Sequence, residues 1–221
     1  RALNSKDYEE SLRDDLNKRL NVISHTTKVL EVLNEGGRKK VFLSNGQHQE
    51  FDLVFNTTTG KPKTAQCGKS LLQHFLGWHV AYETPRFEPG CLKLMDFTVT
   101  QNNGIHFIYL LPFSEKEALV ESTVLSPDPL AEKWYEDIIS DYLSTHFVGA
   151  YEILSTERGI IPMSRLVPDW QRTTIGVGMS GGALRASSGY AFAQMLEQID
   201  QLVVGLNQTS CEIKVRPTAD F

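Results

Sequence analysis

Leucines at four-residue spacing dominate the first twenty positions. Leu12, Leu16 and Leu20 would form one buried stripe of a helix. Asp7, followed three residues later by Glu10, is a possible capping box at the start of that helix. The pattern therefore predicts a helix at the beginning of the chain.

Short apolar runs rich in β-branched and aromatic residues come next. Residues 29–33 and 39–43 predict two strands joined by a turn at 34–37, and 53–55 could add a third strand of a small β-meander. After a polar link at 57–69, four longer runs predict the body of a sheet. These runs cover residues 77–82, 92–97, 105–111 and 118–123.

Helical spacing returns twice in the second half of the chain. Ser126-Pro127 is expected to open a helix that ends before Gly149, with Leu130, Trp134, Ile138 and Tyr142 on one face. Strands near 151–154 and at 172–177 should follow. A final helix is predicted to end at Gly205. Its apolar stripe consists of Phe192, Met195, Leu196, Ile199, Leu202 and Val203.

Composition narrows the class of protein. The 221 residues are 41% apolar and 22% charged, which favours a globular protein of one or two domains. A net charge of -5 disfavours nucleic acid as a partner, and no apolar run approaches the ~18 residues of a membrane span. Cys67, Cys91 and Cys211 are widely spaced, and the six histidines lack metal-binding spacing. We therefore expect a reducing, cytoplasmic setting, no disulfide framework and no metal site.

The segment from Gly176 to Gly181 is a literal G-x-G-x-x-G between a predicted strand and a predicted helix. However, residues 182–189 intervene before the helical pattern, and Asp200 falls inside the final helix rather than at the end of a second strand. A self-contained Rossmann unit is therefore not expected. Two interpretations remain: a backbone turn that approaches a phosphate closely, or a tight strand-to-helix turn without a ligand.

One acidic residue lies among apolar neighbours of a predicted strand. Strand alternation places Glu121 on the same face as Leu119 and Thr123, with Val120 on the other. If that face lines an apolar cavity, desolvation raises the pKa of Glu121 and suits it to general acid catalysis. The local pattern alone favours the alternative, a solvent-facing edge strand.

Six segments, in this order, resemble the bacterial lycopene β-cyclases, and together they span roughly residues 50 to 205. They are residues 73–80 (QHFLGWHV), 94–97 (LMDF), 107–112 (FIYLLP), 118–123 (ALVEST), 157–163 (ERGIIPM) and the glycines and Ser-Gly-Tyr of 181–190. The resemblance implies a mixed α/β flavoprotein fold, in which an FAD-binding domain is interrupted by a β-sheet substrate domain. It assigns 1–60 and 166–221 to the FAD-binding domain and 61–165 to the substrate domain. The family's N-terminal Rossmann unit is missing, so we expect the chain to be a fragment.

The chemistry implied by the resemblance is a proton-initiated isomerisation. Such enzymes convert the acyclic ψ-ends of lycopene into β-ionone rings with reduced FAD, NAD(P)H being the reductant, and without net redox change. The acid of the family's Leu-x-Glu-x-Thr motif falls on Glu121. Asp96 is a second acid carried over by motif, with either an orienting role or that of a strand-end hydrogen-bond acceptor. Glu157 lies in a stretch that the family places near the flavin, and we expect a supporting role for it.

The resemblance also assigns binding positions. The expected FAD contacts are Gly176, Gly181, Gly182, Ser188 and Gly189. Aromatic rings near Glu121 could stabilise a carbocation by about 1–2 kcal/mol, although each could equally pack in the core. The candidates are Trp78, Phe97, Phe107 and Tyr109.

Lycopene dissolves in bilayers, so a peripheral site on the inner membrane is expected. One group of apolar residues could form the face that docks to the membrane, although core packing would explain the group equally well. It consists of Leu71, Leu72, Phe75, Leu76 and Trp78. The chain departs from the family pattern at 56–59, Thr98 and 186–188, which would fit a diverged member with an altered substrate or poor activity. The 221-residue chain alone is expected to be inactive. Two other readings remain: a related flavin monooxygenase or isoprenoid reductase, and a non-catalytic module that binds an apolar ligand.

Overall fold

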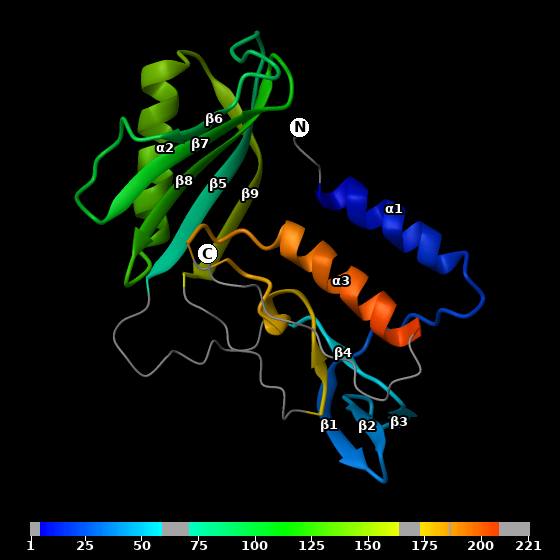
Figure 1. Cartoon of the computed structure of the whole chain (residues 1–221). Coiled ribbons are helices and arrows are strands. Elements are labelled where there is room, and N and C mark those ends of the chain that lie inside the picture. The colour runs from blue at the N-terminus through cyan, green and yellow to red at the C-terminus, as the bar shows by residue number, and fades with distance from the viewer. Residues whose placement is uncertain (1–4, 59–70, 164–172, 186, 208–221) are drawn as a thin grey trace. The chain divides into compact units, whose positions relative to one another are not determined.

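The computed structural model describes residues 5–58, 71–163, 173–185 and 187–207. It divides into two compact units, which are treated separately (Figure 1). The first comprises Arg1–Gly60, Leu166–Ala183 and Ala191–Phe221, and the second comprises Lys61–Arg165 and Leu184–Tyr190. Several sequence predictions fall outside the described residues. They concern most of the polar link at 57–69, the start of the strand at 172–177, Cys67, Cys211 and Ala186. Within the described residues, no helix is both long and apolar enough to cross a membrane.

The second unit is built on a five-stranded antiparallel sheet with the strand order β6-β7-β8-β5-β9. All four predicted runs form strands, and the strand expected near 151–154 extends to Pro162. The strands are β5 (Leu72–Tyr82), β6 (Lys93–Asp96), β7 (Ile105–Pro112), β8 (Glu117–Ser126) and β9 (Tyr151–Pro162). Strands β7, β8 and β5 are therefore flanked on both sides, and β8 is the middle strand.

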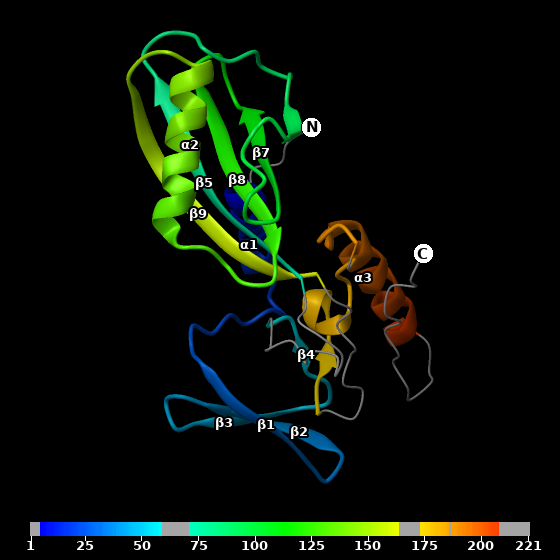
Figure 2. The same ribbon diagram turned by 90° about the vertical axis from the view of Figure 1, so that its left-hand side faces the viewer.

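Helix α2 (Glu132–His146) covers one face of this sheet (Figure 2). Side chains of alternate strand residues pack against it, and Val80, Val120 and Ile139 are completely buried there. Each such side chain stabilises the fold by about 1.5–3 kcal/mol through removal of apolar surface from water. This face is the hydrophobic core of the unit.

Helix α2 begins later than the Ser126-Pro127 signal predicts, because Ser126 is the last residue of β8. The Ser126 hydroxyl donates a 2.7 Å hydrogen bond to the carbonyl oxygen of Asp128 and lies 2.8 Å from Nε2 of His74. The other ring nitrogen of His74 lies 2.5 Å from the Tyr135 hydroxyl, which accepts a hydrogen bond from the backbone of Leu130. A buried polar network thus fixes the connection between β8 and α2.

In the first unit, β1 (Val29–Glu35), β2 (Arg38–Leu43) and β3 (His48–Phe51) form the expected antiparallel meander. The prediction of a third meander strand at 53–55 is wrong. A turn at Asn45-Gly46, where Gly46 has a φ of 82°, reverses the chain earlier. Phe55 belongs instead to β4 (Phe55–Asn56), which pairs in parallel with β10 (Ile175–Gly176).

The two helices of this unit depart from their predicted ends and burial. Helix α1 (Ser5–Asn17) places Asp7 in its first turn rather than at a cap, and the predicted stripe residues Leu12 and Leu16 are each 47% exposed. Helix α3 (Phe192–Asn207) continues through Gly205. Within its unit the helix packs against the short 3₁₀ turn η1 (Gly178–Gly181) through Met195 and Gln198. Leu202 is buried, but most of the predicted apolar stripe is exposed.

Candidate active site

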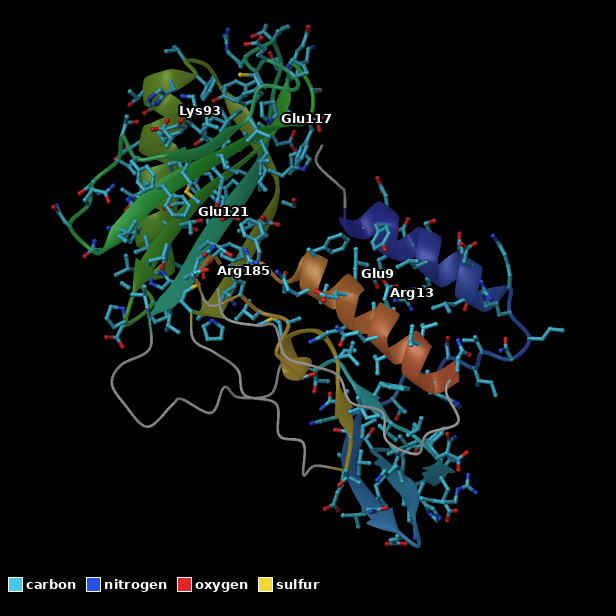
Figure 3. All side chains as sticks on the ribbon, viewed as in Figure 1. Glu9, Arg13, Lys93, Glu117, Glu121 and Arg185 are labelled. Carbon is cyan, nitrogen blue, oxygen red and sulfur yellow. The ribbon has the colours of Figure 1, made fainter. Side chains whose placement is uncertain are left out.

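Four residues lie in register across the middle of the sheet, one on each of four neighbouring strands. Tyr109 on β7 is opposite Glu121 on β8, Glu121 is opposite Gly77 on β5, and Gly77 is opposite Glu157 on β9. Val120 points into the α2 core, so Glu121 lies on the sheet face away from α2. The edge-strand alternative for Glu121 is wrong, because β8 is the central strand of the five. In Figure 3, Glu121 lies midway along the sheet.

The carboxyl group of Glu121 is partly buried and hydrogen-bonded. Thr123, two residues along the same strand, donates a 2.5 Å hydrogen bond from Oγ1 to Oε1 of Glu121. Desolvation raises the pKa of Glu121 to about 7; the Thr123 bond opposes this shift, and the neighbouring Glu157 carboxyl adds to it. A large fraction of Glu121 is therefore protonated at neutral pH, as proton donation requires.

Aromatic rings form one side of the surroundings of Glu121. Phe107 is paired opposite Thr123 and is almost fully buried; its ring centroid lies 5.0 Å from that of Tyr109 and 5.5 Å from that of Phe97. Burial, together with Tyr190 and Glu121 nearby, raises the pKa of Tyr109. Three of the four aromatic residues singled out in the sequence therefore lie together on the Glu121 face.

The fourth aromatic candidate lies elsewhere. Trp78 belongs to the α2 core, where its ring centroid is 6.5 Å from that of Tyr151. Leu76 is in the same core and only 1% exposed. The structure thus separates Trp78 from Glu121 by the thickness of the sheet, and it contradicts the docking face proposed for Leu76 and Trp78.

Asp96 is also on the α2 side of the sheet. Its carboxylate accepts hydrogen bonds from the Tyr142 hydroxyl of α2 (2.8 Å) and from the backbone and side chain of Thr98 (3.0 and 2.5 Å), and Lys93 lies 3.3 Å away. Burial works against ionisation, but these hydrogen bonds outweigh it and hold the pKa of Asp96 well below its usual range. These contacts are those of a strand-end hydrogen-bond acceptor, and the structure does not bring Asp96 to Glu121.

The loop that contains Ser188 and Gly189 lies against the Glu121 face. Gly189 has a φ of 73°, and a Cβ there would lie 3.1 Å from Oε1 of Gln73 on β5. The next residue, Tyr190, is close enough to Tyr109 to contribute to its raised pKa. In Figure 3, Arg185 of this loop lies nearer one end of the sheet than Glu121. Tyr190 and the proximity of Glu157 to Glu121 were both missed from the sequence. The strand register reveals the second, and the position of the loop in the fold reveals the first.

The other three predicted cofactor positions form a tight turn in the first unit. A Cβ on Gly176 would lie 2.4 Å from the Ser180 carbonyl oxygen, and one on Gly181 would lie 2.5 Å from the Gly176 carbonyl oxygen. Gly182 is left-handed, with a φ of 76°. Buried Gln198 of α3 holds the turn, because it accepts a hydrogen bond from the Gly178 amide and donates one to the Gly181 carbonyl. Close backbone packing therefore accounts for glycine at Gly176 and Gly181.

Comparisons with known proteins identify the family of the chain. The sequence matches the family model described as "Lycopene cyclase protein" over residues 1–220. The chain belongs to the lycopene cyclase family. It is 32% identical over 148 residues to a lycopene beta-cyclase of Paracoccus sp. (strain N81106 / MBIC 01143), covering 61% of this chain and 36% of the relative. A chloroplastic lycopene beta cyclase of an Oncidium hybrid cultivar is 26% identical, covering 100% of this chain and 52% of the relative. This lycopene cyclase chain thus spans about half, or less, of these relatives' length.

Solved structures define the fold of this lycopene cyclase family member. A tryptophan halogenase from Shewanella frigidimarina matches with a TM-score of 0.62 and 18% identity, over 92% of this chain and 40% of the halogenase. A geranylgeranyl bacteriochlorophyll reductase-like protein from Thermoplasma acidophilum matches with a TM-score of 0.60 and 13% identity, over 78% of this chain and 46% of the reductase-like protein. The halogenase PltM in complex with phloroglucinol and FAD matches with a TM-score of 0.53 and 10% identity, over 80% of this chain and 41% of PltM. The expected mixed α/β flavoprotein fold with a β-sheet substrate domain is confirmed.

Proposed function

We propose that the protein is part of a lycopene β-cyclase, with the substrate domain and portions of the FAD-binding domain, in which Glu121 donates the proton that starts ring closure. One observation carries this proposal: a partly buried carboxyl group with a pKa raised to about 7 lies at the centre of a sheet face, beside aromatic rings. Family membership supports the substrate class, a linear carotenoid such as lycopene. The product would be γ- or β-carotene.

The reaction requires three things of this face. Glu121 gives its proton to the terminal double bond of the acyclic end, which leaves a tertiary carbocation on the substrate. The π-faces of Phe107 and Tyr109 can stabilise that cation by about 1–2 kcal/mol when water is excluded. Loss of a ring proton then completes an isomerisation with no net redox change. Phe97 extends the same aromatic group.

The flavin part of the proposal rests on the glycine turn and on the loop beside Glu121. We propose that Gly176, Gly181 and Gly182 of the first unit contact FAD, because backbone amides of a glycine turn can approach a phosphate group closely. Ser188 and Gly189 of the second unit are proposed as FAD contacts as well. Reduced FAD, generated with NAD(P)H, would take part without net redox change. Ser188 and Gly189 directly precede Tyr190, which contributes to the raised pKa of Tyr109, so these two proposed contacts adjoin the Glu121 site in sequence.

The test uses the full-length protein in cells that accumulate lycopene. Wild type should yield γ- and β-carotene, and Glu121→Gln should leave lycopene unconverted at equal protein level. Glu117→Gln is the matched control, because Glu117 lies on the same strand and face but pairs with His79 at 3.1 Å. If Glu121→Gln forms the same carotenoid products as wild type, the proposed role of Glu121 is wrong. A reduced or oxygenated product from wild type would point to a reductase or monooxygenase instead.

Two further proposals concern the chain and its setting. We expect the 221-residue chain alone to show little FAD affinity and no cyclisation, and purification with stoichiometric flavin would contradict this. Because lycopene is confined to bilayers, we propose that the enzyme works at the surface of the cytoplasmic membrane. Co-flotation of the full-length protein with lycopene-containing vesicles, measured against protein without vesicles, checks this point.

A further inference from the structure

Two glutamates reach toward each other over a glycine in the middle of the sheet. Glu121 on β8 and Glu157 on β9 are both paired opposite Gly77, which lies between them on β5. Two strand spacings separate their backbones by about 10 Å, a span that two glutamate side chains can bridge. Gly77 leaves room for this, since a Cβ there would lie 3.1 Å from Cγ and 3.3 Å from Oε1 of Glu157. The side chain of Glu157 therefore lies over Gly77.

The two carboxyl groups differ in their access to water. Glu157 is exposed, whereas Glu121 is partly buried. The Glu157 side chain over Gly77 is close enough to raise the pKa of Glu121, in addition to the larger effect of desolvation. Two carboxyl groups close together cannot both ionise readily, so one retains a proton, and the more buried one is favoured to do so.

Other ionisable groups near Glu121 are not placed to replace Glu157. Tyr109 faces Glu121 from β7, and its raised pKa keeps the phenol protonated at neutral pH. Tyr190 of the loop contributes to the raised pKa of Tyr109. His79, two residues from Gly77 on β5, and Glu117, four residues from Glu121 on β8, pair with each other at 3.1 Å. Among the described groups acting on Glu121, Glu157 alone is an exposed carboxyl.

We propose that Glu157 reprotonates Glu121 after each turnover, passing a proton from water to the buried carboxylate. The proposal rests on the proposed cyclase function. In each cycle the O–H bond of Glu121 breaks and a C–H bond forms on the substrate. Glu157, protonated by water, then gives its proton to the Glu121 carboxylate, while the ring proton lost by the carbocation returns to solvent. One proton is taken up and one released, so the isomerisation balances. Glu157 is thus a positioning residue that acts through Glu121.

The test compares Glu157→Gln and Glu157→Asp with wild type in the full-length protein. Glu157→Gln should lower kcat for lycopene at least ~10-fold with little change in KM. In wild type, kcat should fall as pH rises past about 7, where Glu121 loses its proton, and this limb should move to lower pH in Glu157→Gln. Glu157→Asp should restore part of the rate. Glu152→Gln, which removes the same charge from an exposed site on β9, should match wild type.

Wild-type kcat and an unmoved pH limb in Glu157→Gln would overturn the proposal. So would equal losses in Glu157→Gln and Glu152→Gln, which would indicate a general effect of charge. A carbon-13 NMR titration of the Glu121 carboxyl separates this outcome from failure of the proposed function. If the titration midpoint falls in Glu157→Gln but wild type forms no cyclic carotenoid, the carboxyl pair stands and the cyclase function fails. An unmoved midpoint overturns the pair itself.

Discussion

The Tyr142 hydroxyl of α2 donates a 2.8 Å hydrogen bond to Asp96, at the end of edge strand β6. This contact ties the outermost strand to the helix that covers the sheet. It also places the Asp96 carboxylate on the face opposite Glu121, where Lys93 and Thr98 complete its partners. The two acids carried over from the family motif therefore have separate functions in the fold: Asp96 stabilises the edge of the sheet, and Glu121 occupies the proposed site.

We expect Asp96→Asn to lower the free energy of unfolding by about 1–3 kcal/mol at pH 7 while leaving cyclisation intact at permissive temperature. Because folding lowers the pKa of Asp96, its contribution is fully present above the unfolded value of ~4 and is lost as pH falls below it. Urea unfolding between pH 7 and 3 checks this: the acid-induced loss should be smaller in Asp96→Asn than in wild type. Asp141→Asn, an exposed acid next to Tyr142, is the control. Loss of carotene in a folded Asp96→Asn would restore a catalytic role to Asp96.

The elements of the sheet could be predicted, but their pairing could not. Alternation along 118–123 correctly separated Glu121 from Val120, because a two-residue period is a local property of a strand. That β8 is central, and that Gly77 brings Glu157 to Glu121, depends on the order of strands distant in sequence. Periodicity carries no information about strand order, so Glu157 was assigned only a supporting role.

Burial was the least predictable property. Trp78 and Phe107 are both aromatic strand residues, yet they occupy opposite faces, because one pairs with Val120 and the other with Thr123. The leucines of α1 are spaced as for a buried stripe, but Leu12 is 47% exposed in this structure. Helical spacing shows which side of a helix is apolar, whereas burial also requires a partner surface.

A buried histidine should make the second unit sensitive to mild acid. His74 lies between Tyr135 and Ser126, and burial is the main cause of its lowered pKa. The unfolded chain binds a proton near pH 6.5 that folded His74 resists, so its contribution to stability is present above pH ~6.5 and declines below it. Urea unfolding should show a flatter decline between pH 7.5 and 5.5 in His74→Gln, although that variant is less stable overall. His25→Gln, at an exposed site, should keep the wild-type slope.

The glycine turn should depend on one amide side chain. In Gln198→Leu, the buried Gly178 N–H and Gly181 carbonyl lose their partner, which should lower the free energy of unfolding by about 1–3 kcal/mol. Amide hydrogen exchange at Gly178 should accelerate before the rest of the unit is affected. Glu197→Gln, at an exposed position of the same helix, is the control. If Gly178 exchange is unchanged in Gln198→Leu, the side chain does not hold the turn.

Glu121 itself should be a stability defect at high pH, as expected of a residue kept for chemistry. Folding raises the pKa of Glu121 to about 7 from its ordinary value of 4.5, so its contribution to stability is fully present below pH 4.5 and is lost as pH rises through 7. Glu121→Gln keeps a neutral polar group of the same size at every pH. We therefore expect Glu121→Gln to be about 1–3 kcal/mol more stable than wild type at pH 8, with little difference at pH 4.5.

Unfolding curves at the two pH values measure this difference in stability. The control is Glu152→Gln, which changes an exposed acid on β9. A Glu121→Gln variant that gained nothing at pH 8 would mean that Glu121 is ionised without penalty in the fold, and it would remove the physical basis for its role as a proton donor near neutral pH.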